Sequence, residues 1–270
     1  MVDNILVILK QILIIIITLS TFTIIVIGTK KIVIKPILNR LISKKYSKAV
    51  QAIILITFQL LVFYLITRQN SSIVFIAHGN HLLKFIFGAL TGLFVILFSS
   101  VLLSKLKVLK ITKTSKTSVI IIFNLLMFFT VMAVFEEVLF RGILYGILRA
   151  DYTAIPVILL TSTVFILPHL TNKGITPYSV ISILLGGIIL GLLREYSGDI
   201  IAPIGFHIFW NLVQGYLGLD VSGGDTMPSS YKSELQGSNA LTGGVFGIES
   251  SIITILILFI TTSLLFVFMI

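Results

Sequence analysis

The sequence contains no cysteine and few charged residues, and both absences narrow the kinds of protein it can be. Without cysteine among its 270 residues, disulfide bonds and thiolate metal sites are excluded. Charged residues make up 11% of the chain, whereas a soluble domain carries roughly a quarter. Hydrophobic residues make up 57%, and the mean hydropathy is +1.12. A water-soluble fold of this length could not bury so much apolar surface, so we expect the surrounding solvent to be lipid.

Acidic residues are the scarcest charged type, with ten against twenty basic ones. The resulting net charge of +10 could suggest a nucleic-acid partner, but the positions of the basic residues argue against it. Seven of them lie in the stretch 30–48 and five in the stretch 105–116, and both stretches are free of acids and lie between hydrophobic runs. Lysine and arginine in such loops mark the cytoplasmic side and contact anionic headgroups. The sequence therefore predicts membrane lipids, and no nucleic acid, as partners.

Hydrophobic runs long enough to cross a bilayer dominate the chain. The runs are continuous rather than alternating, and each must satisfy its own backbone hydrogen bonds in lipid, which favours helices over strands. We therefore predict an all-α, polytopic integral membrane protein of about eight transmembrane helices, forming a single membrane domain over residues 1–270. A spanning helix needs about 20 apolar residues, and the candidate runs are 5–29, 50–67, 82–103, 118–148, 152–170, 178–196, 199–219 and 251–270.

The long connection over residues 220–250 is polar and rich in glycine, which predicts turns or partial disorder. If the two basic stretches face the cytoplasm, this connection lies there too and both ends of the chain lie outside. Elsewhere, glycines within the apolar runs predict close helix packing. They are Gly142 and Gly146 in the fourth run, and Gly186, Gly187 and Gly191 in the sixth.

The next acids after Asp3 are Glu136 and Glu137, inside the fourth apolar run. A charge at the bilayer centre costs about 3 kcal/mol on insertion scales, so two adjacent acids there require a compensating role. Glu137 and Arg141 are spaced i, i+4 and can pair on one helix face. Glu136 points about 100° away and is left without that partner. We interpret Glu137 and Arg141 as structural or orienting residues and Glu136 as a candidate general base; a buried ion pair that only fixes packing is the simplest alternative.

Two of the four histidines also fall within apolar runs. His169 lies near the end of the fifth run, and His207 lies in the seventh, four residues before Asn211, so His207 and Asn211 share a helix face. Each histidine could be a hydrogen-bonded packing residue. However, the helical rise places Glu136, His169 and His207 on either side of the bilayer midplane, where three helices could present them to one cavity. Residues 118–219 therefore contain the helices with the catalytic motifs.

The sequence thus contains three motifs in this order: Glu136-Glu137-x-x-x-Arg141, Phe165-x-x-x-His169 and His207-x-x-x-Asn211. This set resembles the CAAX protease and bacteriocin-processing family of intramembrane endopeptidases. The segment LTGGVFGIES resembles the glycine-rich piece before the last helix of many bacterial members, so the resemblance covers roughly residues 118 to 270.

The resemblance implies an eight-helix endopeptidase in which Glu136 and His169 activate water against a peptide carbonyl. It further implies that His207 and Asn211 stabilise the oxyanion and that Arg141 positions the glutamate pair. The implied substrate is a membrane-associated, prenylated or secreted peptide. The isoleucine- and lysine-rich composition is typical of AT-rich bacteria, so we expect a multi-pass protein of the bacterial plasma membrane.

Metal dependence stays open at the level of sequence. The helix-borne zinc motif HExxH is absent from the sequence, and metal-free hydrolysis is favoured, with no cofactor. The alternative is a zinc site with Glu136, His169 and His207 as ligands and one open position.

Two further functions compete with proteolysis. A non-catalytic bacteriocin immunity or scaffolding protein could use the same fold to bind a peptide, because a fold alone does not imply turnover. A small transporter or channel could use intramembrane acids and histidines as a proton relay. Against the transporter, the sequence shows no repeat, and its intramembrane polar groups lie only in the second half.

Overall fold

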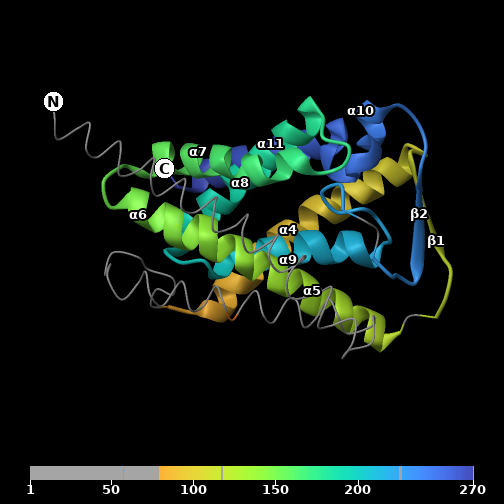
Figure 1. Ribbon diagram of the computed structural model, residues 1–270, viewed down its shortest axis with the longest axis horizontal. Helices are drawn as coiled ribbons and strands as arrows, with labels where there is room; N and C mark the ends of the chain where they lie inside the picture. The colour runs from red at the N-terminus through yellow and green to blue at the C-terminus, as the bar shows by residue number, and fades with distance from the viewer. Residues whose placement is uncertain (1–56, 58–78, 117, 225–226, 270) are drawn as a thin grey trace, which may run out of the picture.

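The computed structural model describes residue 57 and residues 79–116, 118–224 and 227–269, which form a bundle of apolar helices (Figure 1). The runs expected at 5–29 and, apart from Thr57, at 50–67 lie outside the described residues. In the described part, four helices are long and apolar enough to cross a membrane, so the total of eight is not established. These four are His81–Lys105, Val119–Arg149, Ala154–Thr171 and Pro177–Ser197.

The helices of the bundle follow the predicted runs closely, and two of the long ones change their winding near the polar motifs. The helical elements are α4 (His81–Lys105), α5 (Val119–Glu137), the π-helical η2 (Val138–Leu144), α6 (Tyr145–Arg149), α7 (Ala154–Ile166), the 3₁₀-helical η3 (Leu167–Thr171), α8 (Pro177–Ser197), α9 (Ile201–Tyr216), α10 (Asn239–Thr242), the 3₁₀-helical η4 (Gly244–Phe246) and η5 (Ile248–Ser250), and α11 (Ile252–Met269).

The predicted seventh span, 199–219, is shorter than expected. Helix α9 has 16 residues, or about 24 Å at 1.5 Å per residue, and none of its residues is exposed. It packs against α4, α5 and α8. Because α9 is surrounded by protein, lipid thickness does not set its length. This central helix carries His207 and Asn211.

Glycine brings α4 and α9 into backbone contact. A Cβ atom at Gly88 would lie 1.9 Å from the carbonyl oxygen of Ala202, and one at Gly92 would lie 2.3 Å from that of Phe206. Only glycine permits such an approach, and it holds α9 firmly beside α4. The pattern Gly88-x-x-x-Gly92 was readable in the sequence but was not among the predicted packing faces.

The predicted glycine face of α8 is confirmed in part. A Cβ atom at Gly187 would lie 3.0 Å from the Ser162 side chain, and one at Gly191 would lie 2.9 Å from that of Ile158, so both glycines face α7. Gly186 has open space around it and does not belong to the contact.

Two short strands correct the all-helical prediction. Strand β1 (Leu109–Lys113) pairs antiparallel with β2 (Tyr231–Leu235), and Leu109 lies opposite Leu235. The strands escaped prediction because each has five residues and lies in a polar connection, where a search for long apolar runs finds nothing. The described part of 220–250 contains β2, α10, η4 and η5, so the prediction of turns or partial disorder was wrong for those residues.

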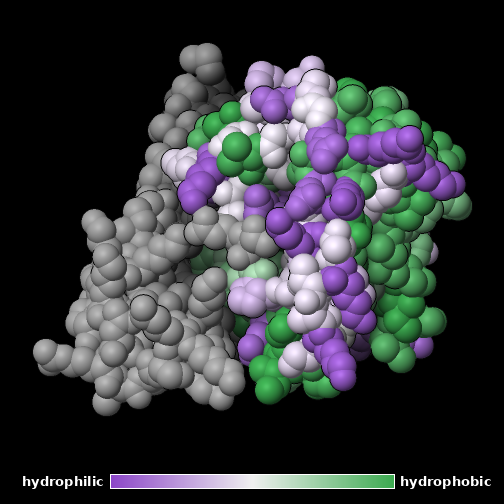
Figure 2. Space-filling view, turned by 90° about the vertical axis from the view of Figure 1, so that its right-hand side faces the viewer, coloured by the Kyte–Doolittle hydropathy of each residue, from purple (hydrophilic) through white to green (hydrophobic). Residues whose placement is uncertain are grey.

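The strand end of the bundle is polar. Figure 2 looks onto this end and shows hydrophilic side chains bordered by a hydrophobic flank. Away from it, large apolar side chains point outward, including Phe94 at 56% exposure, Phe123 at 58% and Phe259 at 60%. An exposed apolar surface of this kind fits a lipid environment.

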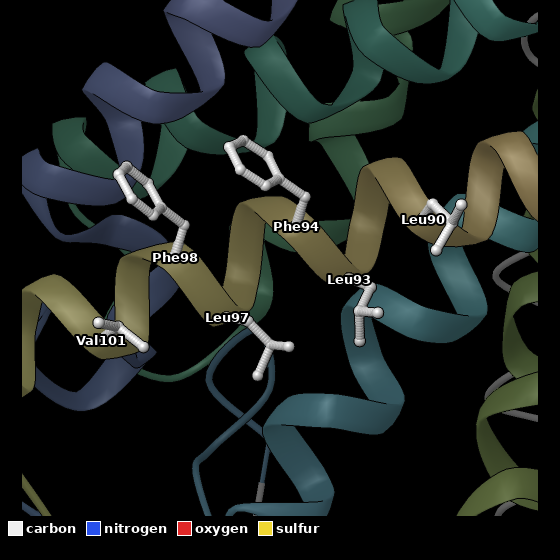
Figure 3. A pocket seen from close by; sticks show the side chains of 6 residues that line it. All are labelled: Leu90, Leu93, Phe94, Leu97, Phe98 and Val101. Atoms are coloured by element: carbon white, nitrogen blue, oxygen red, sulfur yellow. The ribbon is translucent and has the colours of Figure 1, made fainter.

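Helix α4 shows the lipid-facing surface at close range. Figure 3 shows Phe94 and Phe98 projecting from one side of the helix and Leu93 and Leu97 from the other. The Phe94 and Phe98 rings stack with centroids 5.4 Å apart. Together with Leu90 and Val101 these side chains line a shallow hollow of about 510 Å³. The hollow contains none of the motif residues, so we assign it to lipid contact rather than chemistry.

Candidate active site

The two glutamates end α5, and the winding changes directly after them. Residues Val138–Leu144, which include Arg141, are π-helical. Such widened turns are rare and are frequently found at functional sites. The Arg141 carbonyl oxygen accepts a hydrogen bond of 3.0 Å from Nε of Arg194 on α8. A neighbouring helix therefore supports the backbone irregularity next to the glutamates.

Glu137 is fully buried and lies at the centre of a group of charged and imidazole side chains. Its Oε1 accepts a hydrogen bond of 3.2 Å from Nη1 of Arg141, as the i, i+4 spacing predicts. The same oxygen lies 2.8 Å from Nδ1 of His207 on α9. Since a carboxylate oxygen accepts, Nδ1 of His207 carries the proton. Arg141 also donates from Nη2 to the Gly187 carbonyl oxygen of α8, at 3.2 Å.

Glu136 faces the other nitrogen of the same imidazole. Its Oε2 lies 3.8 Å from Nε2 of His207, which is too long for a direct hydrogen bond but short enough for a water molecule to bridge the two groups. The Glu136 side chain is 11% exposed, whereas that of Glu137 is fully buried. The two adjacent acids thus hold opposite sides of His207, and Glu136 is the more accessible.

His169 reaches the cluster from η3. Its Nδ1 lies 2.9 Å from the Phe165 carbonyl oxygen, so Nδ1 donates and Nε2 is left to accept a proton or bind another group. The imidazole interacts electrostatically with Glu136 and His207. The helix tightens to 3₁₀ from Leu167 onward, next to Pro168, which lacks a backbone donor.

The Phe165 ring joins the charged and imidazole groups. The Arg141 guanidinium carbon lies 4.3 Å from its centroid, within cation–π range. The ring centroid lies 4.8 Å from that of His169 and 6.4 Å from that of His207. The phenylalanine of the second motif is therefore a shared packing surface for the site, a role that its spacing to His169 alone did not indicate.

Unpaired polar atoms gather in this cluster. Of five buried side-chain atoms that lack a hydrogen-bond partner in the described residues, three are Oε2 of Glu136, Oε2 of Glu137 and Nε of Arg141. A buried group left unsatisfied costs about 1–3 kcal/mol, and such groups in native proteins call for a functional explanation. The concentration of orphaned atoms makes this cluster the candidate site among the described residues.

Asn211 follows His207 by one helical turn and is buried. Among the described residues, no hydrogen bond to its side chain is present, so the amide is available to a ligand. The structure thus brings Glu136, Glu137, Arg141, His169 and His207 together, and it places Asn211 on the same helix as His207.

The zinc alternative finds no fitting geometry. Within residues 79–116, 118–224 and 227–269, no group of three or more His, Asp or Glu side chains is spaced to hold a metal ion. The reaction that we propose therefore uses no zinc ion.

Sequence reasoning missed one buried acid near this site. Glu249, in η5, is 4% exposed, and its carboxylate accepts a hydrogen bond of 2.8 Å from Nε2 of Gln214 on α9. Burial raises the pKa of the Glu249 carboxyl, against the opposing effect of its hydrogen bonds from Gln214 and Ser222. The available signal was an acid inside the apolar-flanked segment VFGIES, directly before the last apolar run.

The comparisons with known proteins agree with the motif set. Residues 118–213 match a family described as type II CAAX prenyl endopeptidase Rce1-like, and this stretch contains all three motifs. No curated protein matches the chain, and no solved structure does. The resemblance read from the motifs is confirmed over residues 118–213, which match the Rce1-like family of type II CAAX prenyl endopeptidases.

Proposed function

We propose that the protein is an intramembrane endopeptidase that hydrolyses a peptide bond of a prenylated, membrane-associated or secreted peptide. The observation that carries the proposal is the position of Glu136, whose orphaned Oε2 faces Nε2 of His207 at 3.8 Å. At this separation the Glu136 carboxylate and the His207 imidazole can both reach the atoms of one reacting carbonyl and its attacking water.

In the proposed reaction, Glu136 and Nε2 of His169 orient a water molecule, and Glu136 takes its proton as the oxygen attacks the scissile carbonyl carbon. The carbonyl π electrons move to oxygen and form an oxyanion. His207, protonated on both nitrogens and held by Glu137, donates from Nε2 to the oxyanion, together with the Asn211 amide. The intermediate then collapses, the C–N bond breaks, and Glu136 returns the proton to the leaving amine.

Arg141 and Phe165 support this reaction without touching the substrate. Arg141 holds Glu137 from one side at 3.2 Å, and the Phe165 ring packs against Arg141 and both imidazoles.

We further propose that the protein lies in the bacterial plasma membrane with its strand end on the cytoplasmic side, because the lysines of residues 105–116 gather there. Its partners are then lipid and a peptide or lipidated protein, without nucleic acid.

The direct test measures cleavage of a fluorogenic peptide that ends in a farnesylated CAAX sequence, using the purified full chain in lipid nanodiscs. We expect Glu136→Gln to lower kcat by about 10²- to 10⁴-fold, as expected for the loss of a general base. The matched control is Glu234→Gln on β2, where the exposed acid pairs only with Lys232 at 2.9 Å among the described residues. Wild-type kcat in Glu136→Gln would remove Glu136 from the mechanism.

A further inference from the structure

Glu249 is buried outside the three motifs, yet its hydrogen bonds reach helix α9, which carries His207 and Asn211. The carboxylate accepts from Nε2 of Gln214 at 2.8 Å, from the Ser222 backbone N–H at 3.1 Å and from the Ser222 hydroxyl at 2.9 Å. Its own carbonyl oxygen accepts from the Ser182 hydroxyl of α8 at 2.7 Å. One residue of η5 therefore connects α8, α9 and the turn at Ser222.

Hydrogen bonds also connect the turn at Ser222 to the segment that carries His169. The Ser222 carbonyl oxygen accepts a hydrogen bond of 2.9 Å from Nδ2 of Asn172, and the Asn172 backbone N–H donates to the His169 carbonyl oxygen at 2.9 Å. A Cβ atom at Gly223 would lie 2.2 Å from the Lys173 carbonyl oxygen, so the two backbones are in contact. A continuous path of hydrogen bonds thus runs from α9 through Glu249 to η3.

The backbone at Ser222 is strained. Its φ of +49° lies in the left-handed region, which is uncommon for residues other than glycine. Such conformations persist where the surrounding structure fixes them, and they cluster at functional sites. Here Glu249 binds both the N–H and the hydroxyl of Ser222, so the carboxylate is placed to hold this conformation.

We propose that Glu249 is a positioning residue, which fixes η3 and its His169 against α9 and its His207 and Asn211. The expected effect on kcat rests on the proposed peptidase function, whereas the expected effect on the position of η3 relative to α9 does not. Glu249 lies outside the charged cluster and acts through Ser222 and Asn172. It therefore affects the alignment of the reacting groups, and so kcat, more than it affects substrate binding.

The kinetic test compares Glu249→Gln, Asn172→Ala and the control Ser250→Ala with the same farnesylated peptide. A misalignment of about 1 Å can cost up to about a hundredfold in rate, so we expect kcat to fall about ten- to a hundredfold in the first two variants with KM little changed. Ser250 is a matched control because, in the part of the chain that the structure describes, its buried hydroxyl donates to Gly243 and Gly247 and not to any member of the path. We expect its kcat to stay at the wild-type value.

A distance measurement tests the same proposal without reference to activity. Because the chain has no cysteine, Leu170→Cys on η3 and Leu90→Cys on α4 would be its only two spin-label sites, and both positions are exposed. Helix α4 reports the position of α9 because their backbones are in contact. We expect the label–label distance distribution to broaden or shift in Glu249→Gln and Asn172→Ala and to be unchanged in Ser250→Ala.

The outcomes separate the two proposals. Unchanged distances in Glu249→Gln and Asn172→Ala overturn the positioning role, even if kcat falls, since the carboxylate would then act by another route. Altered distances in a protein that cleaves no peptide support the positioning role and count against the peptidase. If Glu249→Gln fails to fold, Asn172→Ala decides, because that side chain is only partly buried and breaks the same path.

Discussion

Glu137 and His207 lie 70 positions apart in the chain and are joined by one hydrogen bond of 2.8 Å between Oε1 and Nδ1. The same carboxylate oxygen also accepts from Arg141. This shared acceptor means that the acid interpreted as a structural partner of arginine also sets the orientation and the proton position of a candidate catalytic imidazole. Carboxylates behind histidines commonly have this function.

Glu137→Gln is therefore expected to harm both stability and chemistry. The substitution leaves the fully buried Arg141 without its charged partner, and breaking a buried pair costs about 3–5 kcal/mol. Denaturant titration of the purified protein in detergent measures this loss, with Glu234→Gln as the exposed control. Equal unfolding midpoints for Glu137→Gln and the wild type would contradict the role assigned to this carboxylate.

Phe165→Leu tests the shared packing surface. Leucine keeps much of the apolar volume but removes the ring that faces Arg141 at 4.3 Å, a contact worth up to about 2 kcal/mol when desolvated. We expect kcat to fall at least about tenfold, since the ring also orients both imidazoles and a small misplacement is costly. Phe94→Leu, on the lipid-facing side of α4, is the matched control and should retain full activity. A Phe165→Leu enzyme as active as this control would refute the role of the ring.

Asn211→Ala tests the proposed oxyanion donor. Removing one such donor costs about 10²- to 10³-fold in kcat, or about 2.7–4 kcal/mol, and it acts on the transition state rather than on substrate binding. Steady-state kinetics should show the loss in kcat with a nearly constant KM. Should KM rise instead while kcat holds, the amide binds the substrate and does not stabilise the oxyanion.

Metal removal distinguishes the favoured reaction from the zinc alternative. Dialysis against a strong chelator is expected to leave peptide cleavage unchanged, because the proposed steps use only Glu136, His169, His207 and Asn211. Elemental analysis of the same sample shows whether a stoichiometric metal was present before dialysis. Loss of activity that added zinc restores would establish a metal site and replace the metal-free account.

Contacts between residues of the same helix were the part of the site that the sequence predicted. Glu137 and Arg141 are four residues apart, so helical geometry alone predicts their pairing, and the structure confirms it. The positions of the long apolar helices were equally readable, because lipid requires continuous runs of fixed length. The motif order also identified the family that residues 118–213 match.

Relationships between distant segments were not predictable from the sequence. The contact of Glu137 with His207 depends on how α5 and α9 pack, and that packing includes a close approach in which a Cβ atom at Gly215 would lie 2.5 Å from the Phe129 ring. Strands β1 and β2 pair across more than a hundred residues, and no local pattern encodes a partner so far away. Glu249 was overlooked for the same reason, since its role comes from tertiary contacts with Gln214 and Ser222.

The central claim is that a water molecule activated by Glu136 attacks the substrate, and a single-turnover reaction in ¹⁸O-labelled water tests it most directly. With enzyme in excess over the farnesylated peptide, mass spectrometry of the new carboxyl terminus should find one ¹⁸O atom per product, and Glu136→Gln should yield no product in the same time. Product that carries only ¹⁶O would show that a protein carboxylate, not water, attacked the carbonyl. Wild-type product formation by Glu136→Gln would contradict the account outright.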